Sequence, residues 1–223
     1  MPGEAVQDYV KAIYKLSQGN DRVTPTQVAE FLKVTAPAVT KMIRRLEAGR
    51  LIRYSRDDGL RLTSSGQKVA LEVIRHHRLL ELYLTEALGY SWDEVHEEAE
   101  RLEHVISETF EDKIEQLLGY PTRDPHGSPI PTRDGTIADL TTLSLSSLRP
   151  GQNAVVDRVS DRDAGMLSYM GELGLYPGTA VSMIDQEPYG GSFRISIANE
   201  RRTVGVDIAN NVFVRLLEGS ESQ

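Results

Sequence analysis

Residues 26–63, TQVAEFLKVTAPAVTKMIRRLEAGRLIRYSRDDGLRLT, decide the fold of the N-terminal part of this chain. Apolar residues recur at helical spacing in residues 26–33 and again in residues 37–48, and a short link separates the two stretches. Gly49 is placed to end the second stretch as a left-handed cap. Residues 51–54 and 60–63 then read as two short strands around an Asp-Gly turn, which is typical of a hairpin.

The residues before this segment add a first helix. Apolar positions in residues 4–18 recur at helical spacing, so the chain opens with three helices followed by a hairpin. That order predicts a winged helix-turn-helix. The alternative is a small α+β domain of the same outline that has no role with nucleic acid.

Helices and then strands are expected in the rest of the chain. Residues 64–88 and a stretch that Ser91 opens have helical patterns, and Ser107 is placed to cap a continuation. Residues 121–131 begin and end with proline and are irregular, and residues 141–151 read as a linker. Residues 152–223 alternate short strands with turns around one helix, at about 163–173, which predicts a small β-barrel. The expected fold class is therefore α+β and multidomain.

The charge is distributed unevenly. The net charge is −8, but residues 1–75 carry 13 Lys and Arg against 8 Asp and Glu, whereas residues 76–140 carry 5 against 15. A basic segment followed by an acidic one favours a polyanion as partner of the first and cations as partners of the second. The chain has no cysteine, which excludes disulfides and thiolate metal sites. No apolar run is long enough for a membrane span, and we expect a cytoplasmic protein without membrane contact.

Histidines and carboxylates gather in the acidic segment. Four of the five histidines lie between positions 76 and 104. His77 and Glu81 share one helix face, and a second face carries His96, Glu100, Glu103 and His104. Imidazole and carboxylate groups together suit a hard or borderline divalent ion. The alternative reading is a pair of acidic helix faces that only contact water.

Three motifs resemble the diphtheria toxin repressor family of iron- and manganese-dependent regulators. They are HRLLE at residues 77–81, VHEEAERLEHV at 95–105 and GSPIP at 127–131. The resemblance implies a winged helix-turn-helix DNA-binding domain (1–72) and an all-α dimerisation and metal-binding domain (73–140). After the linker it implies an SH3-like domain of the ferrous-transport type (152–223), in which ELGLYPG at 172–178 looks like the characteristic turn.

The resemblance also implies two metal sites. By position, the primary site consists of Asp8, Glu100, Glu103 and His104, and the ancillary site of His77, Glu81 and His96. Asp161 and Asp163 lie in the right neighbourhood to complete the ancillary site, and neither is assigned. Iron-type members place Met and Cys where this chain has Asp8 and Glu100, so Mn(II) is the first choice of cofactor and Fe(II) the second. Lys11 stands where the manganese branch has a glutamate, which speaks against a two-metal cluster.

The helix that begins near residue 37 is expected to enter the major groove of DNA. Its outward residues, which we predict contact DNA, are Thr35, Pro37, Ala38, Thr40, Lys41 and Arg44. The wing arginines Arg53, Arg56 and Arg61 would contact the backbone. We expect a homodimer that, when loaded with metal, binds palindromic double-stranded operator DNA and represses metal-uptake genes.

We expect no enzymatic activity, and two alternatives remain. A metal-dependent hydrolase could use the same histidines and carboxylates to activate water. A structural-metal scaffold would hold the ion permanently and would use its winged helix for protein contacts.

Overall fold

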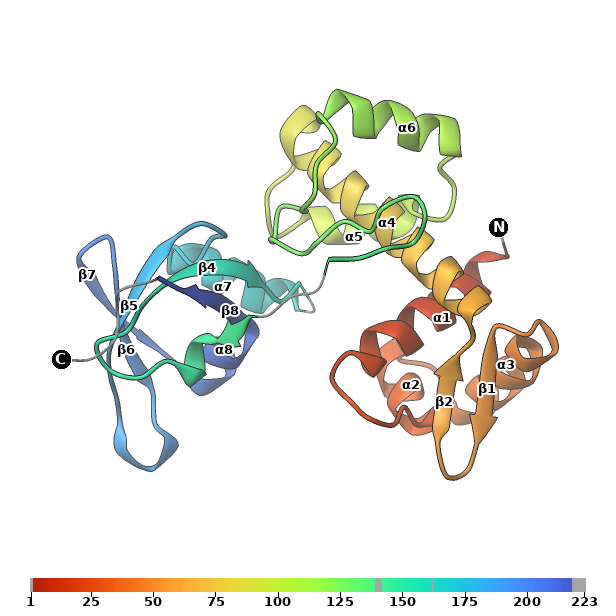
Figure 1. The fold of residues 1–223 in the computed structure, drawn as a ribbon, viewed down its shortest axis with the longest axis horizontal. Helices are drawn as coiled ribbons and strands as arrows, with labels where there is room; N and C mark the ends of the chain where they lie inside the picture. The colour runs from red at the N-terminus through yellow and green to blue at the C-terminus, as the bar shows by residue number, and fades with distance from the viewer. Residues whose placement is uncertain (1, 139–141, 162, 218–223) are drawn as a thin grey trace. The chain divides into compact units, whose positions relative to one another are not determined.

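The computed structural model describes residues 2–138, 142–161 and 163–217, which form two compact units (Figure 1). The first unit consists of Met1–His77, Arg101–Asp112 and Pro131–Ile137. The second unit consists of Arg78–Glu100, Lys113–Ile130 and Ala138–Gln223. Each unit is described by itself.

The first unit opens with the predicted winged helix-turn-helix. Its elements are α1 (Glu4–Ser17), α2 (Pro25–Leu32), α3 (Ala36–Ala48), β1 (Ile52–Ser55) and β2 (Gly59–Leu62). The two strands pair antiparallel, from Ile52 opposite Leu62 to Ser55 opposite Gly59. The apolar faces of all five elements meet in one core, whose fully buried members include Val10, Val28, Val39 and Leu46. The helical periodicity of the sequence thus places the charged faces of α3 and of the wing on the surface.

Local signals fix the ends of these elements. Thr24 caps α2 through a reciprocal capping box with Gln27. The predicted left-handed cap at Gly49 is wrong, because Gly49 has a φ of −76° and continues the right-handed turn. The left-handed residue is Arg50, since the N–H of Leu51 donates to the carbonyl of Leu46 and closes the turn one residue later.

Three helices follow the wing. They are α4 (Ser64–Leu88), which begins in the first unit and ends in the second, α5 (Val95–Leu102) and α6 (Glu108–Leu117). Thr63 caps α4, since its hydroxyl accepts from the N–H of Gly66, and Ser107 caps α6 in the same way through Phe110. The expected helix start at Ser91 is wrong by one turn, because residues 92–94 form a turn and α5 begins at Val95.

The second unit contains the predicted β-rich domain. Its strands are β3 (Leu143–Ser144), β4 (Asn153–Val159), β5 (Ala180–Gln186), β6 (Phe193–Ile197), β7 (Glu200–Val204) and β8 (Val212–Leu216). They form one antiparallel sheet in the order β3-β8-β4-β5-β6-β7. Irregular registers between β4 and β8 and between β5 and β6 bend the sheet. The helices α7 (Ala164–Glu172) and α8 (Val206–Asn211) and the short 3-10 turns η1 (Leu145–Ser147) and η2 (Pro188–Gly190) complete it.

The stretch expected to be a linker, residues 141–151, contributes to this domain. Residue 141 lies outside the described residues, but β3 pairs with β8, and Leu145 and Leu148 are buried in the same core as the strands. Apolar side chains at these two positions pack with the sheet, which a polar linker would not do.

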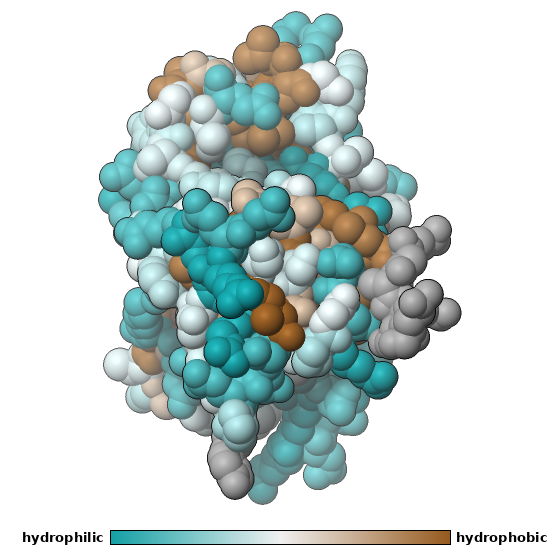
Figure 2. Space-filling view, turned by 90° about the vertical axis from the view of Figure 1, so that its left-hand side faces the viewer, coloured by the Kyte–Doolittle hydropathy of each residue, from teal (hydrophilic) through white to brown (hydrophobic). Residues whose placement is uncertain are grey.

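The surface is mainly polar. Figure 2 shows hydrophilic side chains over most of one face, with hydrophobic ones in separate patches. None of the helices in the described part of the chain combines the length and the apolar character that a membrane span requires.

Candidate metal centre and nucleic-acid interface

Within the first unit, α1 and the residues just after α5 bring three of the four predicted primary ligands together. The Nε2 atom of His104 lies 2.8 Å from Oδ1 of Asp8 and 3.3 Å from Oε1 of Glu103. Glu4, one turn before Asp8 on α1, offers a further oxygen, since the ligand atoms of Glu4, Asp8 and His104 all lie within 4.8 Å of one another. The i, i+4 spacing of Glu4 and Asp8 was the sequence signal for this residue.

The fourth predicted ligand, Glu100, is described by its contacts in the second unit. It lies on α5 with its side chain about half exposed, and its Oε1 atom is 4.0 Å from Nε2 of His96. That contact is the i, i+4 pairing expected of one helix face.

Glu103 is the most buried member of the primary set. Its Oε2 atom accepts a hydrogen bond of 2.6 Å from Nδ1 of His77, and both its oxygens accept from the ammonium of Lys11 at 2.8 and 2.7 Å. Burial raises the pKa of Glu103, but the hydrogen bond from His77 and the Lys11 charge outweigh it and lower this pKa to about 2. Glu103 is therefore ionised at neutral pH.

Gln7 orients the ring of His104. The side-chain oxygen of Gln7 is 2.7 Å from Nδ1 of His104, and an amide oxygen can only accept, so Nδ1 carries the proton. The other ring nitrogen, Nε2, is thereby directed at Asp8. Such outer partners set the tautomer of metal-binding histidines. The sequence analysis missed Gln7, because a glutamine at a buried helix position has no distinctive pattern.

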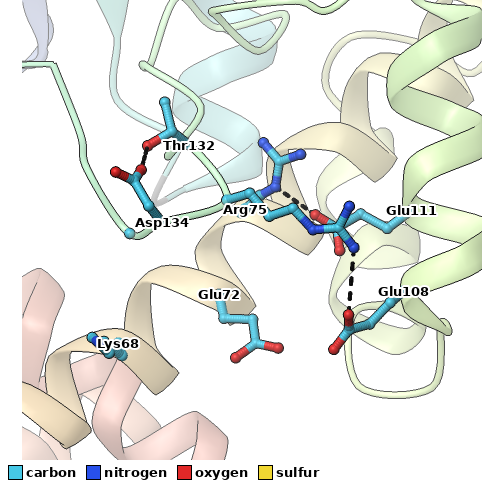
Figure 3. A pocket seen from close by; sticks show the side chains of 9 residues that line it. Lys68, Glu72, Arg75, Glu108, Glu111, Thr132 and Asp134 are labelled. Carbon is cyan, nitrogen blue, oxygen red and sulfur yellow. Dashed lines mark hydrogen bonds and ion pairs between the residues drawn. The ribbon is translucent and has the colours of Figure 1, made fainter.

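A charged network supports the backbone beside this cluster. Nδ1 of His76 contacts the carbonyl of Glu103 at 3.0 Å, and its Nε2 contacts Glu111 at 3.2 Å. Arg75 also donates to Glu111, and Figure 3 shows this pair together with the Arg133–Glu108 pair along a pocket of the first unit. Burial raises the pKa of Glu111, but the hydrogen bond from His76 and the charges of His76 and Arg75 lower it below its ordinary value.

The second unit holds two of the three predicted ancillary ligands. Oε1 of the buried Glu81 is 2.9 Å from Nδ1 of His96, and Oδ2 of Asp161 is 3.9 Å from the same nitrogen. Of the two aspartates left open by the sequence, Asp161 thus lies with these ligands, whereas Asp163 caps α7 by accepting from the N–H of Met166. His77 lies one turn before Glu81 on α4, and its described partners are Glu103 and Lys11 in the first unit.

Two residues of the irregular loop 121–131 extend this group. His126 and Asp124 are buried, and the ligand atoms of Glu81, Asp124 and His126 lie within 4.8 Å of one another. In the described part of the chain, Oδ2 of Asp124 and Nδ1 of His126 are buried and have no hydrogen-bond partner. Buried polar atoms of this kind are the ones that an ion would satisfy. The sequence analysis missed both, although the fifth histidine two residues after an aspartate was a usable signal.

Charge in this cluster shifts both side chains. Burial and the neighbouring Glu81 raise the pKa of Asp124 to about 6. Burial lowers the pKa of His126, but the Glu81 and Asp124 carboxylates outweigh it and raise this pKa to about 9. Crowded carboxylates hold a proton between them where a divalent cation could replace it.

The predicted DNA-contacting residues lie on the exposed face of α3. The six exposed side chains are Thr35, Pro37, Ala38, Thr40, Lys41 and Arg44. The alternating positions Val39, Ile43 and Leu46 are buried in the core. Arg53, Arg56 and Arg61 are exposed on the wing. An exposed, cationic helix beside a cationic hairpin is the arrangement that helix-turn-helix proteins use on the major groove.

Three family models match successive parts of the chain. The N-terminal DNA binding domain of the iron dependent repressor matches residues 1–60, its metal binding and dimerisation domain matches 63–132, and the FeoA domain matches 143–216. These matches confirm the fold class expected from the sequence.

Known proteins of similar sequence and structure cover nearly the whole chain. The iron-dependent repressor IdeR of Mycobacterium leprae is 31% identical over 95% of this chain and 96% of its own length. A structure described as a manganese-dependent transcriptional repressor in complex with manganese has a TM-score of 0.89 and 35% identity, and covers 95% of this chain and all of its own. The manganese regulator SloR has a TM-score of 0.80 and 31% identity over 97% of this chain and all of its own.

The resemblance to the diphtheria toxin repressor family is thus confirmed, since repressors of that name are also similar over almost the full length, for example 28% identical over 97% of the chain in Corynebacterium efficiens. The chain belongs to the iron-dependent repressor family of metal-dependent transcriptional repressors.

Proposed function

We propose that this chain binds Mn(II), with Fe(II) as the second choice, and that the loaded homodimer binds palindromic operator DNA and represses metal-uptake genes. The observation that carries the proposal is the 2.8 Å contact between Asp8, on the first helix of the winged domain, and His104, which follows α5. The primary ligands would be Asp8, Glu100, Glu103 and His104.

The donor set supports this choice of metal. The chain has no cysteine, and the side chains of the primary group offer carboxylate oxygens and one imidazole nitrogen. Oxygen and imidazole ligands suit Mn(II) and Fe(II) better than thiophilic ions. Similar proteins respond to manganese or to iron, as their names state.

The same residues explain how metal would reach DNA binding. When bound, the ion supplies positive charge that neutralises the carboxylates of the two segments. Asp8 is fixed on α1, which packs in one core with α3, so holding Asp8 against His104 also holds the recognition helix. In a dimer this would set two recognition helices for half-sites roughly one turn of DNA apart.

We propose that the second unit carries the ancillary site. Its ligands would come from His77, Glu81 and His96, and Asp161, Asp124 and His126 are added on the geometry above. Since Asp161 follows β4, this site would involve the third domain in the response to metal.

DNA recognition is assigned to Thr35, Pro37, Ala38, Thr40, Lys41 and Arg44, with the wing arginines on the backbone. We keep domain limits of 1–72, 73–140 and 152–223, with residues 141–151 as their connection, as working boundaries for this proposal. A transcriptional repressor acts where the DNA is, which supports a cytoplasmic location.

We propose no catalytic activity. The histidines near both groups pair with buried carboxylates at 2.6 to 2.9 Å, which supports ion binding rather than turnover. The hydrolase and the permanent scaffold remain the competing hypotheses. A scaffold would bind DNA equally with and without chelator, and a hydrolase would show metal-dependent turnover.

The test is selection of DNA by the full-length protein. A pool of randomised duplexes is selected with anaerobic Mn(II), and binding of the winner is then measured by fluorescence anisotropy with Mn(II) or EDTA. Asp8→Ala should lose the metal-dependent gain in affinity, at least about tenfold, while circular dichroism stays unchanged. Asp21→Ala, an exposed aspartate of the same unit, is the matched control and should behave as wild type. Equal metal dependence in both variants would contradict the assignment of Asp8.

A further inference from the structure

Lys11 is a cation inside the metal centre that the proposed function does not use. Its side chain is 6% exposed, and its Nζ atom lies 2.8 and 2.7 Å from the two oxygens of Glu103 and 3.5 Å from Nδ1 of His77. Lysine is almost never buried to this degree unless its charge is paired. The position of Lys11 on α1, three residues after Asp8, places both side chains on the same side of the helix.

The ammonium occupies a place built from metal ligands. Glu103 and His77 face each other at 2.6 Å, and a carboxylate beside an imidazole is a common pair of ligands for a divalent ion. Both carboxylate oxygens are engaged by Nζ, which has three donors and no lone pair, so it fills the place of a cation without being a ligand. Only Oε1 of Glu103 also faces the Asp8–His104 side, at 3.3 Å from Nε2 of His104.

We propose that Lys11 is a built-in counter-cation of the Glu103–His77 pair, and that it limits the primary site to a single divalent ion. The proposal rests on the proposed function in so far as Asp8 and His104 bind metal. A second ion at Glu103 and His77 would meet the ammonium at contact distance, where two positive charges repel strongly because the site is buried. The same ammonium holds Glu103 in place for its one shared oxygen.

Charge reversal at position 11 tests the idea. Lys11→Glu replaces the ammonium with a third carboxylate next to Glu103 and His77, and so creates a set of ligands for a second ion. Lys15→Glu changes the net charge equally and lies one turn further along α1, which makes it the matched control. Bound Mn(II) per chain is measured in the full-length proteins by equilibrium dialysis with metal analysis, and electron paramagnetic resonance detects spin coupling between neighbouring ions.

The expected result is one additional Mn(II) per chain in Lys11→Glu, with a spin-coupled signal, and the wild-type count in Lys15→Glu. The same count in Lys11→Glu as in wild type, or the same increase in both variants, would overturn the proposal. If Lys11→Glu fails to fold by circular dichroism, Lys11→Met removes the charge and keeps an apolar stem in the core. It should bind its first Mn(II) roughly tenfold more tightly, because one like charge is removed. Unchanged or weaker binding in Lys11→Met would overturn the exclusion of a second ion.

The failure of this inference is distinguishable from a failure of the proposed function. If Asp8→Ala loses one ion relative to wild type while Lys11→Glu gains none, only the role of Lys11 is wrong. If Asp8→Ala and wild type bind the same number of ions, the primary site itself is wrong.

Discussion

The Nδ1 atom of His104 donates to Gln7, and this contact decides which ring nitrogen can bind an ion. Gln7 lies on α1 beside Asp8 and is itself buried, and its amide nitrogen donates to the carbonyl of Pro2. The amide is therefore fixed at both ends, so its oxygen stays directed at the ring. Nε2 of His104 is left facing Asp8, as a metal ligand in this place requires.

Gln7→Ala should lower the affinity of the primary site for Mn(II) by about tenfold to a hundredfold, the range found for outer partners of metal ligands. The reason is that the ring of His104 loses its fixed tautomer and orientation. Gln18→Ala, an exposed glutamine at the end of the same helix, should leave the affinity unchanged. Competition titration with a chelating dye measures both. Equal affinities would mean that Gln7 has no part in holding the ligand.

The sequence predicted ligands better than their partners. Asp8, Glu103 and His104 were found because their types and spacing match a family pattern, and the structure brings them together. Gln7 and the pairing of Lys11 with Glu103 were not predictable in this way, because each contact joins residues more than 90 positions apart. Asp124 and His126 lie in an irregular loop, where no helical or strand period tells which side chains turn inward.

At the scale of elements, α6 is held against α4 by buried charges rather than by apolar packing alone. Glu111 of α6 contacts Arg75 and His76 of α4, with side chains at most 5% exposed. Glu108, one turn earlier on α6, pairs with Arg133 on the surface, where both side chains are more than half exposed (Figure 3). The two pairs share a helix but differ in burial, so they separate the effect of a buried pair from that of an exposed one.

Glu111→Gln should destabilise the protein by about 3 kcal/mol, because the substitution leaves Arg75 and His76 without their buried counter-charge. Glu108→Gln should cost less than about 1 kcal/mol, as expected of an exposed pair. Urea unfolding at neutral pH measures both. A similar loss in the two variants would contradict a special role for the buried pair.

The stability of the wild type should depend on pH through the same residue. The pKa of Glu111 is lowered on folding, so its ionised form contributes stability above the pKa of the unfolded chain, near 4.5. This contribution is lost as the pH falls through the folded value. The difference between wild type and Glu111→Gln should therefore be largest at neutral pH and shrink in acid.

Element boundaries were predictable where a local signal decided them. The capping residues Thr63 and Ser107 and the turn before Gly59 follow from side chains within a few positions. Gly59 is required there, since its φ is +73° and a Cβ atom would lie 2.3 Å from the carbonyl oxygen of Val23. The end of α3 was wrong by one residue because a distant tertiary fit, rather than the glycine, sets where the chain turns. The burial of Leu145 and Leu148 was equally hidden, since their partners are strands much later in the chain.

At the scale of the molecule, the second unit joins its helical part to its β-rich part around the ancillary cluster. The carbonyl of His126 accepts from the N–H of Val159 on β4 at 2.9 Å. The ring of Trp92, the only tryptophan, packs between His126 and Tyr176, with ring centres 5.2 and 4.9 Å apart. Trp92 therefore reports on the surroundings of this cluster.

Two neighbouring aspartates allow a test of whether Asp161 is a ligand or only part of the scaffold. Asp161→Asn should leave the stability of the metal-free protein nearly unchanged and should reduce the increase in stability that Mn(II) produces. A ligand at 100 times its Kd stabilises by about 2.7 kcal/mol, so the loss of one site is measurable. Asp163→Asn alters the cap of α7, and should cost up to about 1 kcal/mol without metal while keeping the full increase with Mn(II).

Thermal unfolding with and without Mn(II) separates these effects, and quenching of Trp92 emission by Mn(II) shows which site is filled. Asp161→Asn should need a higher Mn(II) concentration to quench Trp92, because the ion near His126 has lost an oxygen ligand, whereas Asp163→Asn should follow the wild type. The Asp8→Ala variant should also follow the wild type in this assay, since its lost ion is the primary one. If Asp161→Asn quenches at the wild-type concentration, the third domain does not donate a ligand, and its contacts with the loop 121–131 are structural only.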